Sequence, residues 1–599
     1  MKFVGYDESS KGYRLVDSNN KIYISRDVRF LETKSLLNRN KTEQNINNEL
    51  DVYFSDSYEG EEYFFNAEND EEEENLVDEE NLLLNEPTRR SPRDNFGVLP
   101  DKYKSNNFLL YHVKHNNITT IMDEPKTFNQ ATHSISSDEW LQAMREVLNS
   151  IHENRTWELT DLPHDRKAIG SKWVFKRKTN ENGETVRHKA RLVAQGFSQK
   201  FGIDYDEVFA PVARSTTMRM LLSVAGVRGY KVRQYDVKTE FLNGILDEEI
   251  YLKQPQGFQE GNKVYKLKKG LYGLKQAARV WNQTLHESLI RNAFKQSETD
   301  KCLYIYCEND QLIFVLIHVD DILVTSNNEH LMQKLLFNVG KDFELKDLGN
   351  VKHYLGIDVQ QDEKGNFMIS QSNYIDKIVE SARLNDAKLT KFPLDTGYYK
   401  LTGELLPSNE EYRKLIGMLL YLTTNSRPDI AASVSILSQK VTKPRDIDWN
   451  EVKRIIRYIK GTRDLKLYLS SEKCSENVFA FSDANWAEDR EDRKSNSGYY
   501  CSINGGAISW SCTKQNVIAM SSTEAEYVAL SETCKEVSWI KRIAQELKMD
   551  LIESFIYKIL IVTIYCNTII AISSITFIFL ICYSLMNLGQ SRVILERAQ

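Results

Sequence analysis

The chain has 599 residues, too many for a single domain, and its length predicts three or four. Its eight cysteines show neither CxxC nor Cys/His zinc spacing, which argues against a zinc finger or a disulfide framework and favours a reducing compartment. The net charge of −7 argues against a polyanion partner, but residues 42–88 hold 17 acidic residues and no Lys or Arg, leaving 78 basic against 68 acidic residues elsewhere. That balance is typical of a polyanion-binding body joined to an acidic linker.

The N-terminal part predicts a small sheet followed by a linker. Residues 1–35 alternate polar and apolar side chains between Ser-Lys-Gly and Ser-Asn-Asn turns, which predicts a small antiparallel sheet. Residues 36–130 are rich in Asn, Glu, Asp and Ser, and they bury too little apolar surface to offset the entropy of ordering. We therefore expect this segment to be a disordered acidic linker.

A helix and a basic hairpin come next. Trp140, Met144, Val147 and Ile151 recur at helical spacing. Residues 172–197 predict two strands around an Asn-Gly turn, a strong hairpin signal. The hairpin carries a dense set of basic residues, namely Lys172, Lys176, Arg177, Lys178, Arg187, Lys189 and Arg191. This pattern fits either a solvated charged surface or an anion-binding one.

Three carboxylates follow predicted strands. Tyr230, Val232 and Gln234 alternate with polar neighbours in a half-buried strand that ends at Asp236. Residues 312–327 form two apolar runs that flank Asp320 and Asp321 in a predicted tight turn. If the three groups converge, their oxygen ligands suit two Mg²⁺ or Mn²⁺ ions roughly 3.5–4 Å apart, as in phosphoryl or nucleotidyl transfer. A solvated turn is the alternative for Asp320 and Asp321.

The remaining chain predicts helices, a second α/β domain and an apolar tail. Helical periodicity runs through residues 374–384, 412–425 and 448–460, and residues 478–514 predict three strands before an amphipathic helix. Residues 559–586 contain no charge and are long enough to span a bilayer of roughly 30 Å. A frameshifted end is one interpretation of this stretch, and a membrane anchor is the other.

Four segments carry a family resemblance. They are Asp236-Val-Lys-Thr-Glu-Phe-Leu-Asn-Gly, Ile250-Tyr-Leu-Lys-Gln-Pro-Gln-Gly-Phe, Leu271-Tyr-Gly-Leu-Lys-Gln-Ala-Ala-Arg and His318-Val-Asp-Asp. In this order they resemble the reverse transcriptase of Ty1/copia-type retrotransposons, which is part of a Pol polyprotein that also carries ribonuclease H. The resemblance extends from about residue 140 to residue 551.

The resemblance implies roles for residues of the polymerase part. Asp236, Asp320 and Asp321 would be the catalytic metal ligands. Lys189 and Arg191 would grip the triphosphate in the fingers hairpin, since a planar guanidinium suits bidentate phosphate contact. Phe241 would exclude a 2′-hydroxyl, with a core aromatic as the alternative. Lys275 and Gln276 would contact nucleotide or template, with a solvated helix surface as the alternative.

The resemblance also implies a ribonuclease H-like domain with metal-binding carboxylates. Asp483 matches the first of these, and Glu526 matches the second. An N-terminal capping role in Thr523-x-x-Glu526 is the alternative for Glu526. Asn567 stands after an apolar run where the family has its third carboxylate, and no segment matches the fourth.

The expected fold is α+β: a right-hand polymerase followed by an RNase H-like α/β domain, behind a disordered acidic linker. The expected domains are an integrase C-terminal β remnant (1–35), the linker (36–130), fingers and palm (131–395), thumb and connection helices (396–474), an incomplete RNase H-like domain (475–552) and an apolar aberrant tail (553–599). Residues 343–359 resemble the primer-grip hairpin of the family, with Leu355-Gly356 at its turn.

The expected activity is RNA-directed DNA synthesis with Mg²⁺ or Mn²⁺ and with a defective RNase H domain. Expected partners are an RNA template, a DNA primer, RNA–DNA hybrid, dNTPs and element particle proteins, but no membrane; the expected location is a cytoplasmic element particle or the nucleus. His318, Glu240 and Ala278 replace the usual tyrosine, small residue and proline of the family. These departures support an alternative, an inert nucleic-acid-binding remnant of a degenerate element.

Overall fold

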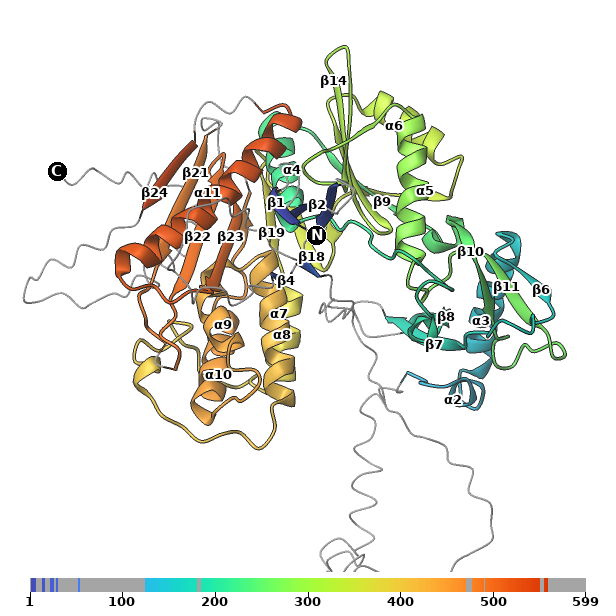
Figure 1. The fold of residues 1–599 in the computed structure, drawn as a ribbon, viewed down its shortest axis with the longest axis horizontal. Helices are drawn as coiled ribbons and strands as arrows, with labels where there is room; N and C mark the ends of the chain where they lie inside the picture. Colours follow the sequence, from blue (N-terminus) through green and yellow to red (C-terminus); the bar gives the residue numbers. More distant parts are fainter. Residues whose placement is uncertain are drawn as a thin grey trace, which may run out of the picture. The chain divides into compact units, whose positions relative to one another are not determined.

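The structure is a computed structural model that describes residues 124–179, 185–469, 477–489, 491–549 and 554–558, together with five short strands nearer the N-terminus (Figure 1). The chain divides into two compact units, Met1–Pro125 and Lys126–Gln599.

The first unit contains the predicted antiparallel sheet, in which β2 (Tyr13–Val16) pairs with both β1 (Lys2–Tyr6) and β3 (Ile22–Ser25). Strand β4 (Arg29–Phe30) pairs with β5 (Val52–Tyr53). A two-residue strand therefore lies inside the segment that we expected to be disordered. The rest of that segment, up to residue 123, lies outside the described residues. Helix α2 (Phe128–Thr132) begins before residue 130, so the expected end of the linker was too late.

The second unit begins with helices and two small antiparallel sheets. Helix α2 (Phe128–Thr132) is followed by α3 (Ser137–Glu153), which buries Trp140, Met144 and Ile151 against a hairpin. The hairpin is formed by β7 (Ser171–Thr179) and β8 (Thr185–Ala194), as predicted, although its turn lies outside the described residues. The other sheet has the order β10 (Ile245–Leu252), β11 (Val264–Lys269) and β6 (Trp157–Thr160).

A six-stranded antiparallel sheet, here called the palm sheet, forms the centre of the unit. Its order is β12 (Lys295–Gln296), β13 (Leu303–Glu308), β14 (Gln311–His318), β15 (Asp321–Ser326), β9 (Val232–Val237) and β16 (Leu345–Asn350). Helices α5 (Ala277–Arg291) and α6 (Glu329–Val339) cover one face, and α4 (Ser215–Arg228) covers the other (Figure 1).

Burial on both faces explains the long apolar run of β14. Successive residues of a strand point to opposite faces. Ile313, Val315 and Ile317 accordingly pack toward α5 and α6, whereas Phe314 and Leu316 pack toward α4. The predicted buried strands on either side of the Asp-Asp pair are therefore confirmed.

A hairpin and a helical bundle follow the palm sheet. The predicted Leu355-Gly356 turn joins β17 (His353–Tyr354) to β18 (Ile357–Gln361), in a sheet that continues through β19 (Phe367–Ser370) and β20 (Leu467–Tyr468). The predicted helices are confirmed as α7 (Ser372–Ser381), α8 (Glu410–Asn425) and α10 (Asp446–Gly461), and they pack around α9 (Ala431–Ser438).

The C-terminal domain has the strand order β23 (Gly506–Lys514), β22 (Asn496–Ile503), β21 (Val478–Ala484) and β24 (Ser554–Lys558). The first three strands are antiparallel, β24 is parallel to β21, and α11 (Ser522–Glu546) packs on β21 and β22. We expected the domain to end at residue 552, but β24 lies beyond that bound and pairs with β21. The apolar run before Asn567 lies outside the described residues.

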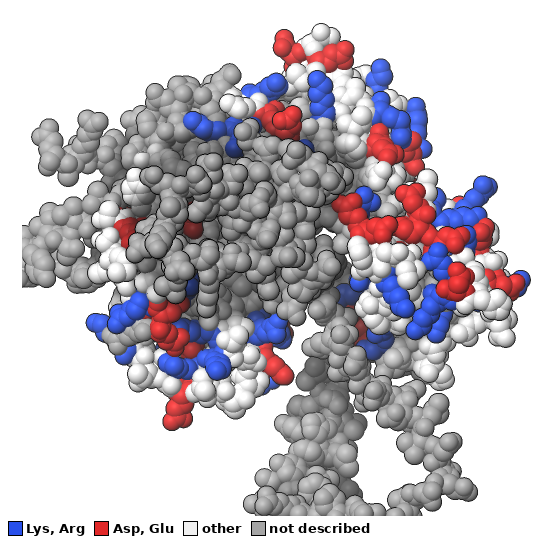
Figure 2. Space-filling view, in the orientation of Figure 1, with Lys and Arg blue, Asp and Glu red and all other residues white. Residues whose placement is uncertain are grey.

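No helix among the described residues is both long and apolar enough to cross a bilayer, and the stretch at 559–586 lies outside those residues. On the face shown in Figure 2, Lys and Arg are interspersed with Asp and Glu over the described surface. On this face the basic excess is therefore not gathered into one patch.

Candidate active site

The three carboxylates expected to bind metal come together at one end of the palm sheet. Asp236, near the end of β9, lies directly opposite Asp321, the first residue of β15. The backbone N–H of Val237 donates a 3.1 Å hydrogen bond to the carbonyl of Asp320. Directly opposed residues of an antiparallel pair have Cβ atoms about 4.5–5.5 Å apart. The strand register thus brings residue 236 beside both Asp320 and Asp321.

The turn that carries Asp320 has an unusual backbone. It is a two-residue connection formed by Val319 and Asp320, because His318 pairs with Asp321. The prediction that both aspartates form the turn was therefore wrong for Asp321, which is the first residue of β15. The first residue of the turn, Val319, has a φ of 59°, a left-handed conformation that costs a β-branched residue roughly 1–3 kcal/mol. The buried indole Nε1 of Trp281, on α5, donates a 2.8 Å hydrogen bond to the Val319 carbonyl. Packing of α5 therefore stabilises a turn conformation that is unfavourable for the β-branched residue at position 319.

The carboxylates are half-buried and repel one another. Burial raises the pKa of Asp236, and Asp320 raises it further, whereas Lys189 opposes the shift. Burial also raises the pKa of Asp321, against a 3.1 Å hydrogen bond from the Gln234 side chain, and the charges of Asp320 and Asp236 add to the rise. The local electrostatics favour a bound cation.

The donor set fits a hard divalent cation, because its three side chains supply only oxygen. In the part of the chain that the structure describes, however, no group of three or more His, Cys, Asp or Glu side chains already has a geometry able to hold a metal ion. The strands bring the carboxylates together, but the side chains are not arranged for coordination.

Lys189 and Arg191 extend from β8 toward the acidic cluster. They lie two positions apart on the strand, so their side chains point to the same face. Burial lowers the pKa of Lys189, with Arg191 and Lys178 adding to the effect, while Glu240 and Asp236 oppose it. The guanidinium carbon of Arg191 lies 5.5 Å from the ring centroid of Tyr272, and its Nε is buried without a hydrogen-bond partner. An unused buried donor beside a lysine suits an anion.

Phe241 lies in a short 3₁₀ turn, Glu240–Asn243, just after β9. Its half-buried ring packs edge-on against Tyr272, with 4.8 Å between the centroids. Glu240 is only 3% exposed, and its carboxylate accepts a 2.6 Å hydrogen bond from the Tyr272 hydroxyl. A carboxylate at position 240 would repel a triphosphate unless it were paired or turned away, and here it is paired.

Lys275 and Gln276 have different surroundings. Lys275 is exposed and donates a 3.0 Å hydrogen bond to the Tyr205 hydroxyl. Gln276 is fully buried; its amide accepts from Gln199 at 2.9 Å and donates to the Asp204 carbonyl at 2.8 Å. The solvated helix-surface alternative is therefore wrong for Gln276. Both polar ends of this side chain are used inside the protein, and it ties the loop after β8 to the start of α5.

The second predicted acidic pair lies in the C-terminal domain. Asp483, on β21, is 5% exposed; burial raises its pKa to about 6, and the Glu526 charge contributes to the rise. Asp483 lines a cavity of about 40 Å³ together with Asp429 of the helical bundle. Glu526 lies in α11, which Ser521 and Glu524 cap, so the capping alternative for Glu526 is wrong. Asn567 lies outside the described residues.

Three residues that support this site were not predicted from the sequence: Gln234, Tyr272 and Trp281. Gln234 was assigned only to the alternating pattern of its strand, and Tyr272 only to a family motif. Trp281 carries no local signal for its contact with residue 319, 38 residues away.

The raised pKa of Asp321 predicts how stability depends on pH. As the pH rises through the raised pKa of Asp321, ionisation of its carboxyl group lowers the stability of the folded state. Below the pKa of the carboxyl in the unfolded chain, the group is neutral in both states and this loss of stability disappears. Without divalent cations, we expect Asp321→Asn to melt a few degrees higher than the wild type at neutral pH, but not near pH 3. Mg²⁺ should narrow this difference by stabilising the wild type.

Thermal denaturation at the two pH values checks this expectation, with the exposed Asp386→Asn as the matched control. If Asp321→Asn melts at or below the wild-type temperature in metal-free neutral buffer, the site does not store this repulsion.

Comparison with known proteins places these residues in a family. Residues 154–396 match the family model described as reverse transcriptase (RNA-dependent DNA polymerase), and residues 1–44 match a retroviral polymerase SH3-like domain. The solved structure of a foamy viral protease-reverse transcriptase in complex with RNA/DNA hybrid aligns with a TM-score of 0.38 at 10% identity, covering 74% of this chain and 56% of that one. So low a score adds nothing to the assignment.

Curated relatives are far more similar in sequence. The retrovirus-related Pol polyprotein from transposon TNT 1-94 of Nicotiana tabacum is 36% identical over 79% of this chain and 36% of its own length. The retrovirus-related Pol polyprotein from transposon RE2 of Arabidopsis thaliana is 38% identical over 72% of this chain and 29% of its own length. The chain therefore spans about a third of the length of these two relatives. A putative transposon Ty5-1 protein of Saccharomyces cerevisiae is 34% identical and is covered over its full length. The chain belongs to the Ty1/copia-type retrotransposon Pol polyproteins and contains their reverse transcriptase domain.

Proposed function

We propose that this chain is an RNA-directed DNA polymerase that extends a primer by two-metal nucleotidyl transfer. The observation that carries the proposal is the pairing of Asp236 with Asp321, beside Asp320, at the end of the palm sheet. The primer 3′-hydroxyl attacks the α-phosphate of a dNTP, a new phosphodiester bond forms, and pyrophosphate leaves. Bound at this site, two divalent cations would activate the attacking oxygen and stabilise the leaving group.

Each residue of the site then has a role in binding or positioning. Asp236, Asp320 and Asp321 would hold the cations, for which their mutual repulsion makes them suitable. Lys189 and the unpartnered Nε of Arg191 would bind the triphosphate. Contacts with the template and primer would be mainly to the backbone and hence salt-dependent, since copying must tolerate any sequence.

Replacing Asp320 tests the proposal. We expect Asp320→Asn to abolish primer extension on an RNA template with Mg²⁺, a loss of at least about a thousandfold, because the amide removes a charge from the metal-binding set. Gel analysis of extended primers measures it. The matched control is Asp310→Asn, in the turn at the other end of β14, which should extend normally. A wild type that binds hybrid but never extends it would instead support the alternative, an inert remnant.

The position of Phe241 predicts sugar selection. If its ring excludes the 2′-hydroxyl by shape, Phe241→Ala should increase incorporation of ribonucleotides relative to deoxyribonucleotides by about 10- to 100-fold, the range that one steric group supplies in a pocket. The ratio of kcat/KM for the two nucleotides measures this effect. Tyr272→Phe, which keeps the ring contact but loses the hydroxyl bond to Glu240, should leave the ratio near the wild-type value. An unchanged ratio in Phe241→Ala would make this residue a core aromatic only.

We also propose that the C-terminal domain is RNase H-like but does not cleave RNA. Three antiparallel strands, a helix and a strand parallel to the first, in the order β23-β22-β21-β24, support that fold. Two findings support inactivity: Asp483 is buried beside the helical bundle, and the sequence has an amide at Asn567 where the family has a carboxylate.

The proposed absence of RNA cleavage can be tested on the RNA template and DNA primer used for the extension assay. We expect no shortening of labelled RNA under conditions in which the primer is extended, whether Mg²⁺ or Mn²⁺ is present, because the matched residues that the structure describes supply only two carboxylates for the two-metal site. The Asp483→Asn variant sets the background. Cleavage above that background would show that a further carboxylate completes the site.

A further inference from the structure

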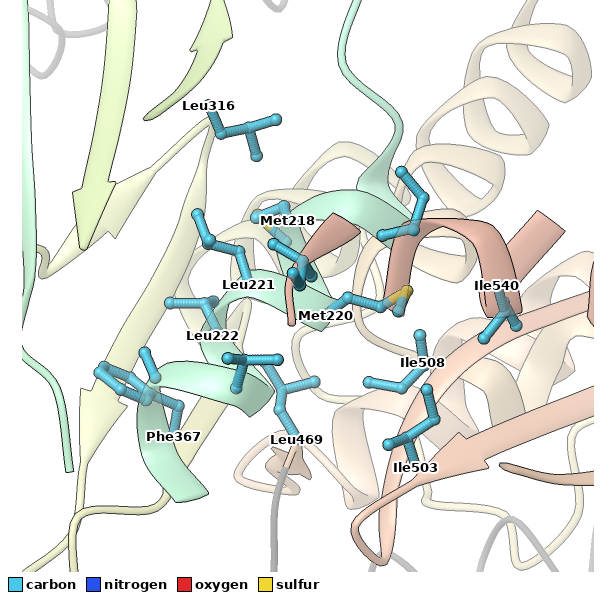
Figure 3. Close-up of a cluster of buried hydrophobic side chains, with 14 of the residues drawn as sticks. Met218, Met220, Leu221, Leu222, Leu316, Phe367, Leu469, Ile503, Ile508 and Ile540 are labelled. Carbon is cyan, nitrogen blue, oxygen red and sulfur yellow. The ribbon is translucent and has the colours of Figure 1, made fainter. Parts of the chain in front are cut away.

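Helix α4 has no solvent-facing side. Eleven of its fourteen residues are buried, from Thr216 to Gly226. A helix that is buried all round belongs to the core of a larger unit. On one side α4 packs on the palm sheet and on β19, for example against Leu316 and Phe367. On the other side it packs on the C-terminal domain, where Ile503, Ile508 and Ile540 belong to the same cluster (Figure 3). One hydrophobic core therefore joins the two domains.

Arg219 lies buried in the middle of this core. It is 3% exposed, and its guanidinium donates hydrogen bonds to three backbone carbonyls: that of Ile508 on β23 at 2.7 Å, and those of Thr424 and Asn425 on α8 at 3.0 and 3.1 Å. Its guanidinium carbon lies 4.0 Å from the ring centroid of Trp510. A single cation on the helix that covers the palm sheet thus contacts both the helical bundle and the C-terminal domain.

The charge is stabilised without a hydrogen-bonded carboxylate. Burial lowers the pKa of Arg219 to about 9, and Tyr499 and Glu536 oppose that shift. The guanidinium is therefore still cationic at neutral pH, held by carbonyl dipoles and by an aromatic face. Trp510 is itself fixed, because its indole Nε1 donates a 2.9 Å hydrogen bond to the Thr423 carbonyl. An apolar or smaller side chain would leave these carbonyls unpaired in a dry interface.

Further contacts connect both ends of α4 to the C-terminal domain. The Arg214 guanidinium lies 4.5 Å from the ring centroid of Trp539, and Arg228 donates a 3.2 Å hydrogen bond to the Leu547 carbonyl. On the palm side, the hydroxyl of Thr217 donates a 2.5 Å hydrogen bond to Asp300, just before β13. A movement of the C-terminal domain would therefore be transmitted through α4 to the palm.

We propose that Arg219 is a positioning residue that holds the C-terminal domain, the palm sheet and the helical bundle together as one rigid body. The C-terminal domain then contributes to the polymerase as a structural part, whether or not it cleaves RNA. Arg219 contributes no group to the acidic site, and the docking does not depend on the proposed polymerase activity.

Native cysteines allow the test to be made on the full chain. Cys307 on β13 and Cys534 on α11 are exposed and take spin labels, whereas Cys302 and Cys501 are buried. The other cysteines, Cys474, Cys512, Cys566 and Cys582, are replaced by serine. The distance distribution between the two labels then reports how rigidly the palm and the C-terminal domain are joined.

We expect one narrow distribution for the wild type and a broad one for Arg219→Met, which keeps the length but loses the charge and the hydrogen bonds. Arg219→Lys keeps the charge without the planar fork, so it should give an intermediate width. Arg291→Met, which removes an exposed arginine paired with Asp342, is the matched control and should stay narrow. A narrow distribution in a folded Arg219→Met would overturn the proposal.

A second variant keeps the test decisive if Arg219→Met does not fold. Trp510→Phe retains a ring over the guanidinium but loses the bond to Thr423, and it should broaden the distribution partially; no broadening would overturn the proposal. Primer extension in the presence of a trap gives a separate functional measure, with shorter products per binding event expected from Arg219→Met. Absence of extension by the wild type would instead refute the proposed function. The distance measurement would then still test the junction between the palm sheet and the C-terminal domain.

Discussion

The register between β9 and β15 is the constraint on which the rest of the structure depends. It brings Asp236 opposite Asp321, residues that are far apart in the sequence, and burial and mutual repulsion then raise the pKa of both. A slip of one residue would turn every side chain of a strand to the other face. Apolar burial on both faces of the palm sheet opposes such a slip. The hydrophobic core therefore keeps the acidic groups close together despite the repulsion between their negative charges.

In the turn between β14 and β15, packing likewise stabilises a conformation that is unfavourable by itself. A β-branched residue at position 319 disfavours the left-handed backbone that the turn adopts, and the hydrogen bond from Trp281 offsets part of the cost. Helix α5, which carries Trp281, begins just after the loop that Gln276 ties to Gln199. The loop, the helix and the acidic turn are therefore connected through buried side chains, and distant substitutions can displace the site.

The C-terminal domain is bound to the reverse transcriptase domain through a shared hydrophobic core and not through a linker. Helix α4 belongs equally to both, and the guanidinium of Arg219 lies where three parts of the chain meet. This arrangement places Asp483 against the helical bundle, where it lines a small cavity beside Asp429. Close docking therefore coincides with the burial of Asp483.

The sequence by itself determined the locations of the carboxylates and the elements that carry them. Period-2 and helical patterns predicted α3, the basic hairpin, the strands that flank Asp320, and α7, α8 and α10 of the bundle, because these signals are local to each element. Family motifs made Asp236, Arg191 and Phe241 candidate site residues, because such motifs depend on residue identity and order. Neither kind of signal carries information about contacts between distant segments.

Tertiary structure decided what depends on such contacts. It placed Ser554–Lys558 beside β21 as a strand of the C-terminal domain, because strand pairing depends on a partner from another segment. It buried Gln276 and paired Glu240 with Tyr272, because burial depends on neighbours from other segments. Position 219 looks like an ordinary arginine near the start of a helix. Only the packing of a second domain over that helix makes its charge a link between three parts of the chain.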